Sequence, residues 1–374
     1  MLLGVLLLAV AAVALVAGSS LVGNGLSTAI GGRPSAQVRS VAIGLAGALA
    51  TTLVAVGRGQ TLVASGIPFG AAMFVLAAAF GAAVILARRP LEVVEPVLYA
   101  APAAGIVLVA LSVANDRSLT RAAGGLLALV FVPYLLWVLM EPAASTPAEP
   151  DAGFTPSRPD QPWPAADPAA SVAEPAGGSA DQPAAVAFPA SGERGAPSTM
   201  TPASTATGAP STAAAASTSA AAPGEARRGG VGAAVGRAAA GLALVVGAAF
   251  ALVEGTIRVG AGGKLAPGFA GAALAGSLTA LPFALLVVFP RRGASDPGER
   301  TMTVVAGLVT FVPGVAALVR PFELDGPAAV CLLATAAMYA VAATWMLVRG
   351  RSDRAMGAVL LLGYAACLVV AGSL

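Results

Sequence analysis

Residues 2–22 read LLGVLLLAVAAVALVAGSSLV, an apolar stretch without a charged side chain. A helix needs roughly 20 such residues to cross the hydrocarbon core of a bilayer. The stretch is the first of ten similar runs, and the other nine are 40–57, 62–87, 94–114, 119–140, 232–253, 266–289, 302–319, 327–348 and 355–373. The sequence therefore predicts an all-α polytopic membrane protein with about ten transmembrane helices.

The first run also resembles the apolar part of a secretory signal peptide, since small residues follow it. It lacks the basic segment that precedes the apolar part of a signal peptide. We therefore expect residues 2–22 to be retained as a membrane span.

The composition excludes several classes of function. Of the 374 residues, 57% are hydrophobic and 10% are charged, whereas a soluble domain carries about 25% charged residues. The chain has no His, which rules out Ser-His-Asp and Cys-His catalysis and His-ligated zinc or haem. Two cysteines, Cys331 and Cys367, are too few for a disulfide framework or a metal cage. We expect no enzyme activity, no cofactor, no metal centre and no nucleic-acid partner.

The middle of the chain differs in composition from its flanks. Residues 141–230 are rich in Pro, Ala, Ser, Thr and Gly, and nine acidic residues lie between Glu141 and Glu225. Such a segment buries too little apolar surface to become ordered. Two interpretations stay open, a simple tether or a segment regulated by a cytoplasmic partner or a kinase. The predicted organisation is an N-terminal membrane repeat (1–140), a disordered acidic linker (141–230) and a C-terminal membrane repeat (231–374).

Basic residues predict the orientation. If the ten runs are successive crossings, fifteen of the 21 Lys and Arg lie on the side that holds the linker, against six on the opposite side. By the positive-inside rule the linker is cytoplasmic and both termini face outward. Five crossings in each half then give the two halves opposite orientations, as in transporters built from inverted repeats. We expect a multi-pass protein of a bacterial inner membrane.

Short patterns recur at corresponding places in the two halves. Gly18–Gly25 at the expected end of the first span corresponds to Gly247–Gly255 at the expected end of the sixth. The second and seventh spans share a Thr-containing segment, and the third and eighth share a spacing of four residues. These patterns are Ala50–Ala55 with Leu278–Phe283, and Gly66, Gly70 and Phe74 with Thr303, Gly307 and Phe311. The last span of each half has a basic residue followed by glycine three positions later, Arg121 with Gly124 and Arg354 with Gly357.

At these residues the sequence resembles the calcium/cation antiporter superfamily, whose sodium/calcium exchanger fold has two inverted five-helix repeats joined by a cytoplasmic loop. The second helix of each family repeat carries Gly-Thr-Ser-Leu-Pro-Glu, and the third carries Gly-Asn-x-x-Gly-Ser-Asn-x-Phe-Asn. The first motif is matched by Thr51, Thr52 and Leu53 and by Thr279, Leu281 and Pro282. The skeleton of the second is matched by Gly66, Gly70 and Phe74 and by Gly307 and Phe311. The resemblance covers both flanks but not the linker.

The chain departs from the family at the ligand positions. Ala55 and Phe283 stand where the resemblance places the two cation-binding glutamates. The asparagines and serines of the third helix are replaced by Ile67, Ala71, Ala72 and Val75 in the first half and by Val304, Leu308, Val309 and Val312 in the second. Calcium takes six to eight oxygen ligands, usually including carboxylates. The remaining hydroxyl and carbonyl oxygens suit a monovalent ion better than a divalent one.

Nine residues are candidates for a substrate or ion pathway: Asn24, Thr51, Thr52, Ser65, Glu254, Ser277, Thr279, Pro282 and Thr310. Glu254 is either an ion-binding carboxylate or an interfacial group paired with Arg258. The hydroxyls either line a polar pocket or bond to their own helix backbone. Pro282 either frees backbone carbonyls for a cavity or merely kinks a packed helix.

The sequence predicts a sodium/calcium exchanger-like membrane transporter with altered or lost cation specificity. Its expected partners are the lipid bilayer, a small monovalent cation or another small solute, and a cytoplasmic partner of the linker. The resemblance implies alternating access in which the first and sixth spans slide past a central bundle. The alternative is a non-transporting membrane scaffold or accessory subunit derived from an exchanger fold.

Overall fold

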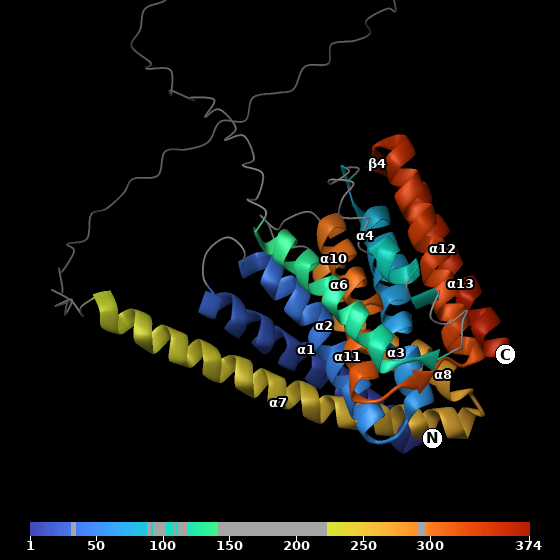
Figure 1. Cartoon of the computed structure of the whole chain (residues 1–374), viewed down its shortest axis with the longest axis horizontal. Helices are drawn as coiled ribbons and strands as arrows, with labels where there is room; N and C mark the ends of the chain where they lie inside the picture. The colour runs from blue at the N-terminus through green and yellow to red at the C-terminus, as the bar shows by residue number, and fades with distance from the viewer. Residues whose placement is uncertain are drawn as a thin grey trace, which may run out of the picture. The chain divides into compact units, whose positions relative to one another are not determined.

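A computed structural model describes residues 1–30, 35–87, 91–92, 102–107, 109–110, 118–140, 223–289 and 297–374 (Figure 1). Within these residues, eight helices are long and apolar enough to cross a membrane, and a shorter apolar helix covers Arg121–Leu136. The expected run 94–114 lies mostly outside the described residues, and its parts 102–107 and 109–110 are helical. The expected linker lies outside them up to residue 222. The described chain is thus an all-α polytopic membrane protein.

The elements of the N-terminal half are α1 (Leu2–Ile30), α2 (Ser35–Gly57), α3 (Thr61–Met73), the π-helical segment η1 (Phe74–Phe80), α4 (Gly81–Leu86), β1 (Leu91–Glu92), β2 (Ser118–Leu119) and α6 (Arg121–Met140). Those of the C-terminal half are α7 (Pro223–Gly263), α8 (Pro267–Ala270), the π-helical segment η3 (Gly271–Gly276), α9 (Ser277–Val288), α10 (Pro297–Val309), α11 (Phe311–Val319), β3 (Phe322–Glu323), α12 (Gly326–Arg349), β4 (Arg351–Ser352) and α13 (Arg354–Ser373). Helices dominate because lipid offers the backbone no hydrogen-bond partner.

Two helices are longer than their apolar runs. The sequence predicts that the first span ends between Gly18 and Gly25 and the sixth between Gly247 and Gly255, but α1 continues to Ile30 and α7 to Gly263. Neither extension contains a proline to end the helix. α7 also starts at Pro223, inside the stretch assigned to the linker. Its 41 residues span about 61 Å, twice the thickness of a hydrocarbon core. Figure 1 shows α7 running beside α1 and projecting past it.

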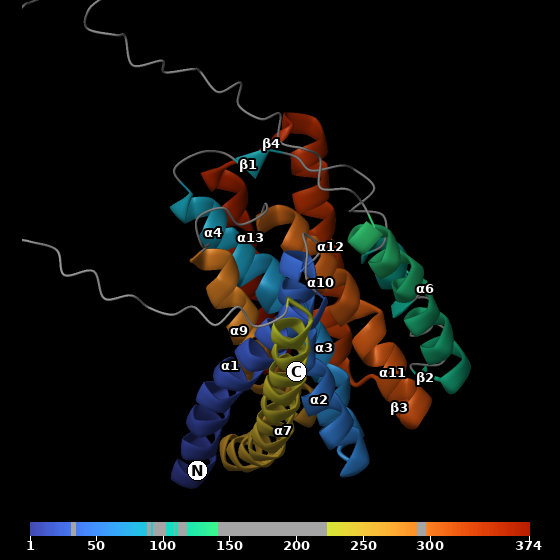
Figure 2. The same cartoon turned by 90° about the vertical axis from the view of Figure 1, so that its left-hand side faces the viewer.

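The long helices α1 and α7 pack against each other in opposite directions. A Cβ atom added at Gly4 would lie 3.2 Å from the carbonyl oxygen of Gly255, and one at Gly25 would lie 2.7 Å from that of Ala234. Residues later in α1 therefore contact residues earlier in α7, so the two helices run antiparallel. Antiparallel packing means that an even number of spans lies between the two helices, which agrees with five spans in the first half, α1 being the first and α7 the sixth. Figure 2 shows the same pair from another side.

Two close glycine contacts join the first half of the chain to the second. A Cβ atom at Gly124 of α6 would lie 2.7 Å from the carbonyl oxygen of Gly314 in α11, and the converse distance is also 2.7 Å. A Cβ atom at Gly357 of α13 would lie 2.6 Å from the carbonyl oxygen of Gly81 in α4. Gly314 follows Gly81 by 233 positions, and Gly357 follows Gly124 by the same number. The two halves are therefore related by an internal repeat. In the first contact α6 of the first half meets α11 of the second, and in the other α4 of the first half meets α13 of the second.

Two short antiparallel ladders join loops of different halves. β1 pairs with β4, with Leu91 opposite Ser352, and β2 pairs with β3, with Ser118 opposite Glu323. Each ladder links a loop of the first repeat to a loop of the second. The ladders therefore tie the two repeats together outside their helices.

Carboxylates cap the helices of the last hairpin. Asp325 precedes α12 and caps it, and its Oδ2 also accepts a 3.0 Å hydrogen bond from the backbone N–H of Gly268 in α8. Asp353 caps α13 by accepting a 3.0 Å bond from the N–H of Met356. Arg349 Nη1 lies 2.8 Å from the Asp353 carboxylate. The N–H of Met356 and then Arg349 lower the pKa of Asp353, because both stabilise its charged form.

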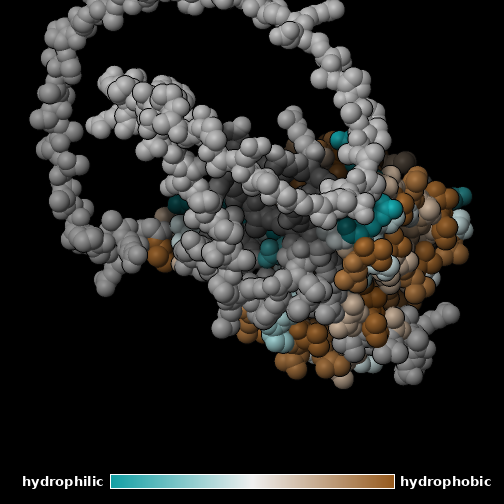
Figure 3. All heavy atoms as spheres, turned by 90° about the horizontal axis from the view of Figure 1, so that it is seen from above, coloured by the Kyte–Doolittle hydropathy of each residue, from teal (hydrophilic) through white to brown (hydrophobic). Residues whose placement is uncertain are grey.

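Apolar side chains form both the core of the bundle and much of its outer surface. Phe69, Phe80 and Phe283 are among the largest fully buried side chains, whereas Val348 is 79% exposed and Val369 is 74% exposed. The face in Figure 3 is mostly hydrophobic where described residues are visible. Apolar groups on both the inside and the outside are expected of a bundle whose surface meets lipid tails.

Candidate functional site

The threonines of α2 are buried and bond to their own helix. Thr51 Oγ1 donates to the carbonyl of Gly47 over 2.8 Å, and Thr52 Oγ1 donates to that of Ala48 over 2.7 Å. Both side chains have 0% exposure. They lie in the last two turns of a helix that ends at Gly57. These bonds agree with the interpretation in which the hydroxyls bond to their own helix backbone, not with the one in which they line a polar pocket.

The candidates on α9 follow directly after the π-helical segment η3. Thr279 is fully buried and donates to the carbonyl of Gly276 over 2.8 Å. Pro282 lies within α9 and is buried. A Cβ atom at Gly47 would lie 3.0 Å from the carbonyl oxygen of Thr279, so α2 and α9 are in backbone contact here. The structure thus brings together the two segments that resemble the first family motif.

Ser65 and Thr310 lie on the third and eighth spans. Ser65 Oγ donates to the carbonyl of Leu62 over 2.8 Å, and Thr310 Oγ1 donates to that of Ala306 over 2.6 Å. Thr310 separates α10 from α11, and its methyl group would contact a Cβ atom placed at Gly105. These hydroxyls therefore also bond within their own spans.

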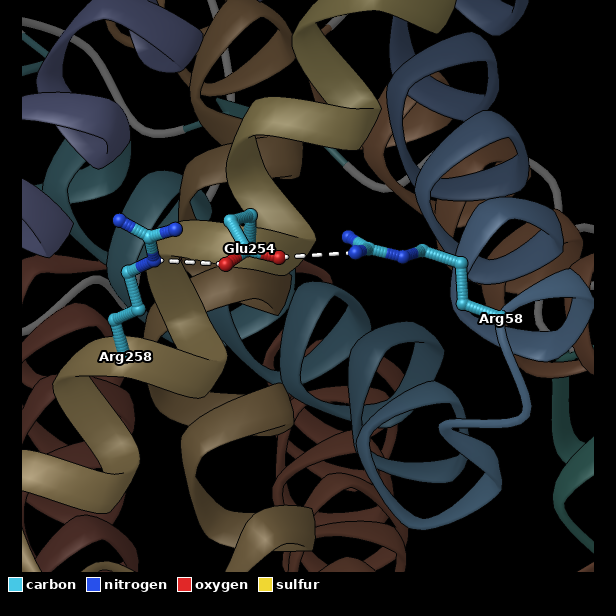
Figure 4. Close-up of polar contacts among 3 residues, drawn as sticks. All are labelled: Arg58, Glu254 and Arg258. Atoms are coloured by element: carbon cyan, nitrogen blue, oxygen red, sulfur yellow. Dashed lines mark hydrogen bonds and ion pairs between the residues drawn. The ribbon is translucent and has the colours of Figure 1, made fainter.

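Glu254 joins α7 to the end of α2. Its Oε2 lies 3.0 Å from Arg58 Nη2, and its Oε1 lies 2.7 Å from Arg258 Nε (Figure 4). The pairing with Arg258 was one of the two interpretations of Glu254. The pairing with Arg58 was not predicted, because the two residues lie in different halves of the chain. Both side chains of that pair are partly exposed.

Asn24 and Glu254 occupy different surroundings from those predicted. Asn24 lies inside α1 rather than at its end, and its carbonyl accepts bonds from Ser27 and Thr28 over 3.1 and 2.7 Å. Glu254 likewise lies within α7, nine residues before that helix ends. Their predicted placement at span ends was wrong because both helices continue through small residues.

One polar contact between α9 and α13 is not revealed by the sequence. Ser277 Oγ lies 3.1 Å from Tyr364 Oη. The ring of Tyr364 packs edge-on against Phe74 with centroids 5.9 Å apart. Ser277 is the first residue after η3, and Phe74 is the first residue of η1. π-helical segments are frequent at functional sites. The contact thus links α13 to the residues that adjoin both π-helical segments.

A second aromatic contact also joins the two halves. Phe131 of α6 packs against Phe311 of α11 with centroids 5.4 Å apart. Tyr364 follows Phe131 by 233 positions, the same separation as the glycine pairs. Only the spacing of Arg121 and Arg354 could have pointed to Tyr364, since it aligns α6 with α13. A tyrosine within an apolar run otherwise gives no signal of its partner.

The positions that carry cation ligands in the resembling family are buried and apolar here. Ala55 and Phe283 each have 0% exposure. The same exposure is found at Ile67, Ala71, Ala72, Val75, Val304, Leu308, Val309 and Val312. Among the described residues, no three His, Cys, Asp or Glu side chains gather in a group that could hold a metal ion.

Comparisons with known proteins give matches among solved structures alone. No family model and no curated protein matches the chain. An H+/Ca2+ exchanger named CAX superposes with a TM-score of 0.64 at 12% identity, covering 99% of this chain and 85% of that one. The sodium-calcium exchanger NCX_Mj, soaked with Na+, gives 0.55 at 14% identity and 98% coverage of both chains. Native YfkE gives 0.56 at 13% identity, covering 98% of this chain and 92% of that one.

The chain has the exchanger fold. The prediction of a polytopic all-α fold is confirmed, and so is the resemblance at the level of the fold. At 12–14% identity, the likeness concerns the arrangement of helices and not the ligands. CAX and NCX_Mj are both named as exchangers.

Proposed function

We propose that this exchanger-like protein is a membrane transporter whose substrate is a monovalent cation or another small solute rather than calcium. The observation that carries the proposal is the burial of Ala55 and Phe283, both with 0% exposure, where the resemblance places acidic ligands. A calcium ion needs six to eight oxygens, usually with carboxylates among them. Neither side chain supplies an oxygen.

The proposal also includes an orientation in the membrane and a pair of moving helices. The linker faces the cytoplasm and both termini face outward, which rests on the distribution of basic residues. Sliding of α1 and α7 past the bundle is supported by their close glycine contacts, which make them one packed pair. The Arg58–Glu254 ion pair links that pair to the end of α2.

The scaffold alternative is favoured by one observation. The hydroxyls of Thr51, Thr52 and Thr279 already donate to carbonyls of their own helices. A site built from such groups offers lone pairs but no free donor. A non-transporting descendant of an exchanger would have the same features.

Substitution of the three threonines separates the two functions. We expect the triple variant Thr51→Val, Thr52→Val and Thr279→Val to lower uptake of a monovalent ion into proteoliposomes by about tenfold, equivalent to roughly 1.4 kcal/mol. The reason is that valine keeps the shape but removes the oxygens that would face the ion. The measurement is uptake of Na+, K+ or Rb+ along an imposed gradient.

The matched control is Thr28→Val. Thr28 makes the same kind of bond to its own helix, 2.7 Å to the carbonyl of Asn24, but is exposed. Its uptake should equal that of the wild type. Uptake by the triple variant at the wild-type rate would contradict a threonine-lined path, and a wild type without uptake of any solute would favour the scaffold.

A further inference from the structure

The turn between the last two helices is rich in arginine. Residues 349–354 read RGRSDR, so three arginines and one aspartate occupy six positions. This basic turn (residues 349–354) joins α12, which ends at Arg349, to α13, which begins at Arg354. Gly350 has a φ of 65°, in the left-handed region that glycine adopts without steric cost. The basic turn, at β4, projects beyond the neighbouring α4 and α10 (Figures 1 and 2).

Only one of the three arginines is engaged by described side chains. Arg349 Nη1 lies 2.8 Å from Asp353 Oδ2, and the guanidinium carbon of Arg349 lies 4.6 Å from the ring centroid of Trp345. Asp353 is also the N-cap of α13. Arg351 and Arg354 are exposed and form no ion pair with any side chain that the structure describes. Two guanidinium groups of the basic turn are therefore available to an external anion.

The strand that pairs with the basic turn adds one acidic residue. Glu92 of β1 stands opposite Arg351 in the ladder with β4. With Glu92 and Asp353 included, three positive charges still outnumber two negative ones. A guanidinium also has five N–H donors, so a carboxylate at one edge leaves the other donors free. The basic turn thus retains both charge and hydrogen-bond donors for an anion.

The lengths of the two helices place the basic turn at the level of the lipid headgroups. α12 has 24 residues and α13 has 20, which correspond to about 36 and 30 Å. A hydrocarbon core is about 30 Å thick, so α12 exceeds it by about one helical turn. Trp345 and Arg349 lie in that last helical turn, and tryptophan is enriched at the membrane interface.

Exposed apolar side chains precede the basic turn directly. Leu347 is 66% exposed and Val348 is 79% exposed, and both lie in the last helical turn of α12. A surface with guanidinium groups at the headgroup level and apolar side chains next to them matches a molecule with an anionic head and hydrocarbon tails. A free inorganic anion would match only the charge. The surface therefore fits a phospholipid better than a soluble anion.

We propose that the basic turn binds the phosphate of an anionic phospholipid, with Arg351 and Arg354 on the headgroup and Leu347 and Val348 against the acyl chains. Guanidinium groups bind phosphate through paired, charge-assisted hydrogen bonds. The distribution of basic residues predicts that this lipid lies in the cytoplasmic leaflet. The site goes beyond the proposed function and does not depend on transport, because lipid binding alone defines it.

Quenching of Trp345 fluorescence by brominated lipids tests the site. The tryptophans of the full chain are Trp137, Trp163 and Trp345, so replacing the first two by Phe leaves Trp345 as the reporter. This protein is reconstituted in mixtures of phosphatidylcholine and phosphatidylglycerol in which one lipid is brominated. We expect a preference for phosphatidylglycerol of more than about tenfold near Trp345, because each arginine near an anionic surface contributes about fivefold.

Arginine substitutions identify the ligands. Arg351→Gln or Arg354→Gln should each lower the preference for phosphatidylglycerol by about fivefold, and the double variant should show almost none. Arg121→Gln is the matched control, because Arg121 precedes Arg354 by 233 positions, is exposed and also begins a helix. Its predicted place at the opposite membrane face should leave the preference near Trp345 unchanged.

Two results would overturn the proposal. One is equal quenching by the two brominated lipids before any arginine is replaced, and the other is an unchanged preference in the folded double variant. Thermal melting establishes folding, and the melting temperature should stay near that of the parent protein because both arginines are exposed. If the double variant does not fold, the two single variants decide in its place, and an unchanged preference in both contradicts the site.

Discussion

Gly70→Ala is expected to abolish the folded protein. A Cβ atom at this position would lie 2.2 Å from the carbonyl oxygen of Ala272 and 2.5 Å from its Cα. Both are backbone atoms of η3, so no flexible side chain can move aside. Because interiors are close-packed, α3 and η3 would have to separate along much of their contact. We expect loss of the monodisperse peak in size-exclusion chromatography of the detergent extract.

The helix contact extends beyond one residue. A Cβ atom at Gly66 would lie 2.2 Å from the carbonyl oxygen of Gly268, one turn away on the same face. Gly66→Ala should therefore resemble Gly70→Ala. Small residues allow helices in lipid to approach this closely, and these two glycines make the third and seventh spans neighbours.

The control for the glycine substitutions is Gly247→Ala. Gly247 lies on α7 with nothing within 4 Å of an added Cβ atom. Alanine there should be tolerated or should stabilise the helix by about 0.5–1 kcal/mol. A Gly70→Ala protein that elutes and melts as the wild type does would contradict the close packing of α3 on η3.

Phe283→Glu is expected to destabilise the protein strongly. Phe283 is fully buried, so the substitution removes a packed ring, at about 3–5 kcal/mol, and adds a carboxylate without a partner. Insertion of such a charge at the centre of a helix costs roughly 2.5–3.5 kcal/mol. Thermal melting of the detergent-solubilised protein should fall by tens of degrees or fail to show a folded state.

Phe289→Glu serves as the matched substitution. Phe289 follows the last residue of α9 and is 69% exposed, so glutamate there meets solvent or lipid headgroups. We expect its melting temperature to stay near that of the wild type. A Phe283→Glu protein as stable as Phe289→Glu would show that water or a cation reaches position 283, contrary to an apolar centre.

The sequence was sufficient to predict features that depend on local composition. Apolar runs of about 20 residues predicted the spans, and the spacing of Arg121 with Gly124 and Arg354 with Gly357 predicted corresponding helices. The glycine contacts of α6 and α13 confirm that correspondence. Opposite orientation of the halves was predicted from charge and agrees with the antiparallel packing of α1 on α7.

Other features depend on pairings between distant residues and could not be predicted. Arg58 and Glu254 form an ion pair, and Ser277 meets Tyr364, although nothing local to any of these residues indicates its partner. Helix ends were also misplaced, because glycine and alanine continue a helix that hydropathy alone would end. The general tendency of membrane Ser and Thr to bond to their own helix did anticipate Thr51 and Thr52.

Calcium uptake by proteoliposomes tests most directly the claim that this exchanger fold has lost its divalent-cation ligands. The purified wild type is reconstituted, and radioactive calcium uptake is followed under an outward sodium gradient and, separately, an outward proton gradient. We predict uptake equal to that of protein-free liposomes under both gradients, because Ala55 and Phe283 supply no carboxylate. Gradient-dependent calcium uptake well above that background would contradict the account.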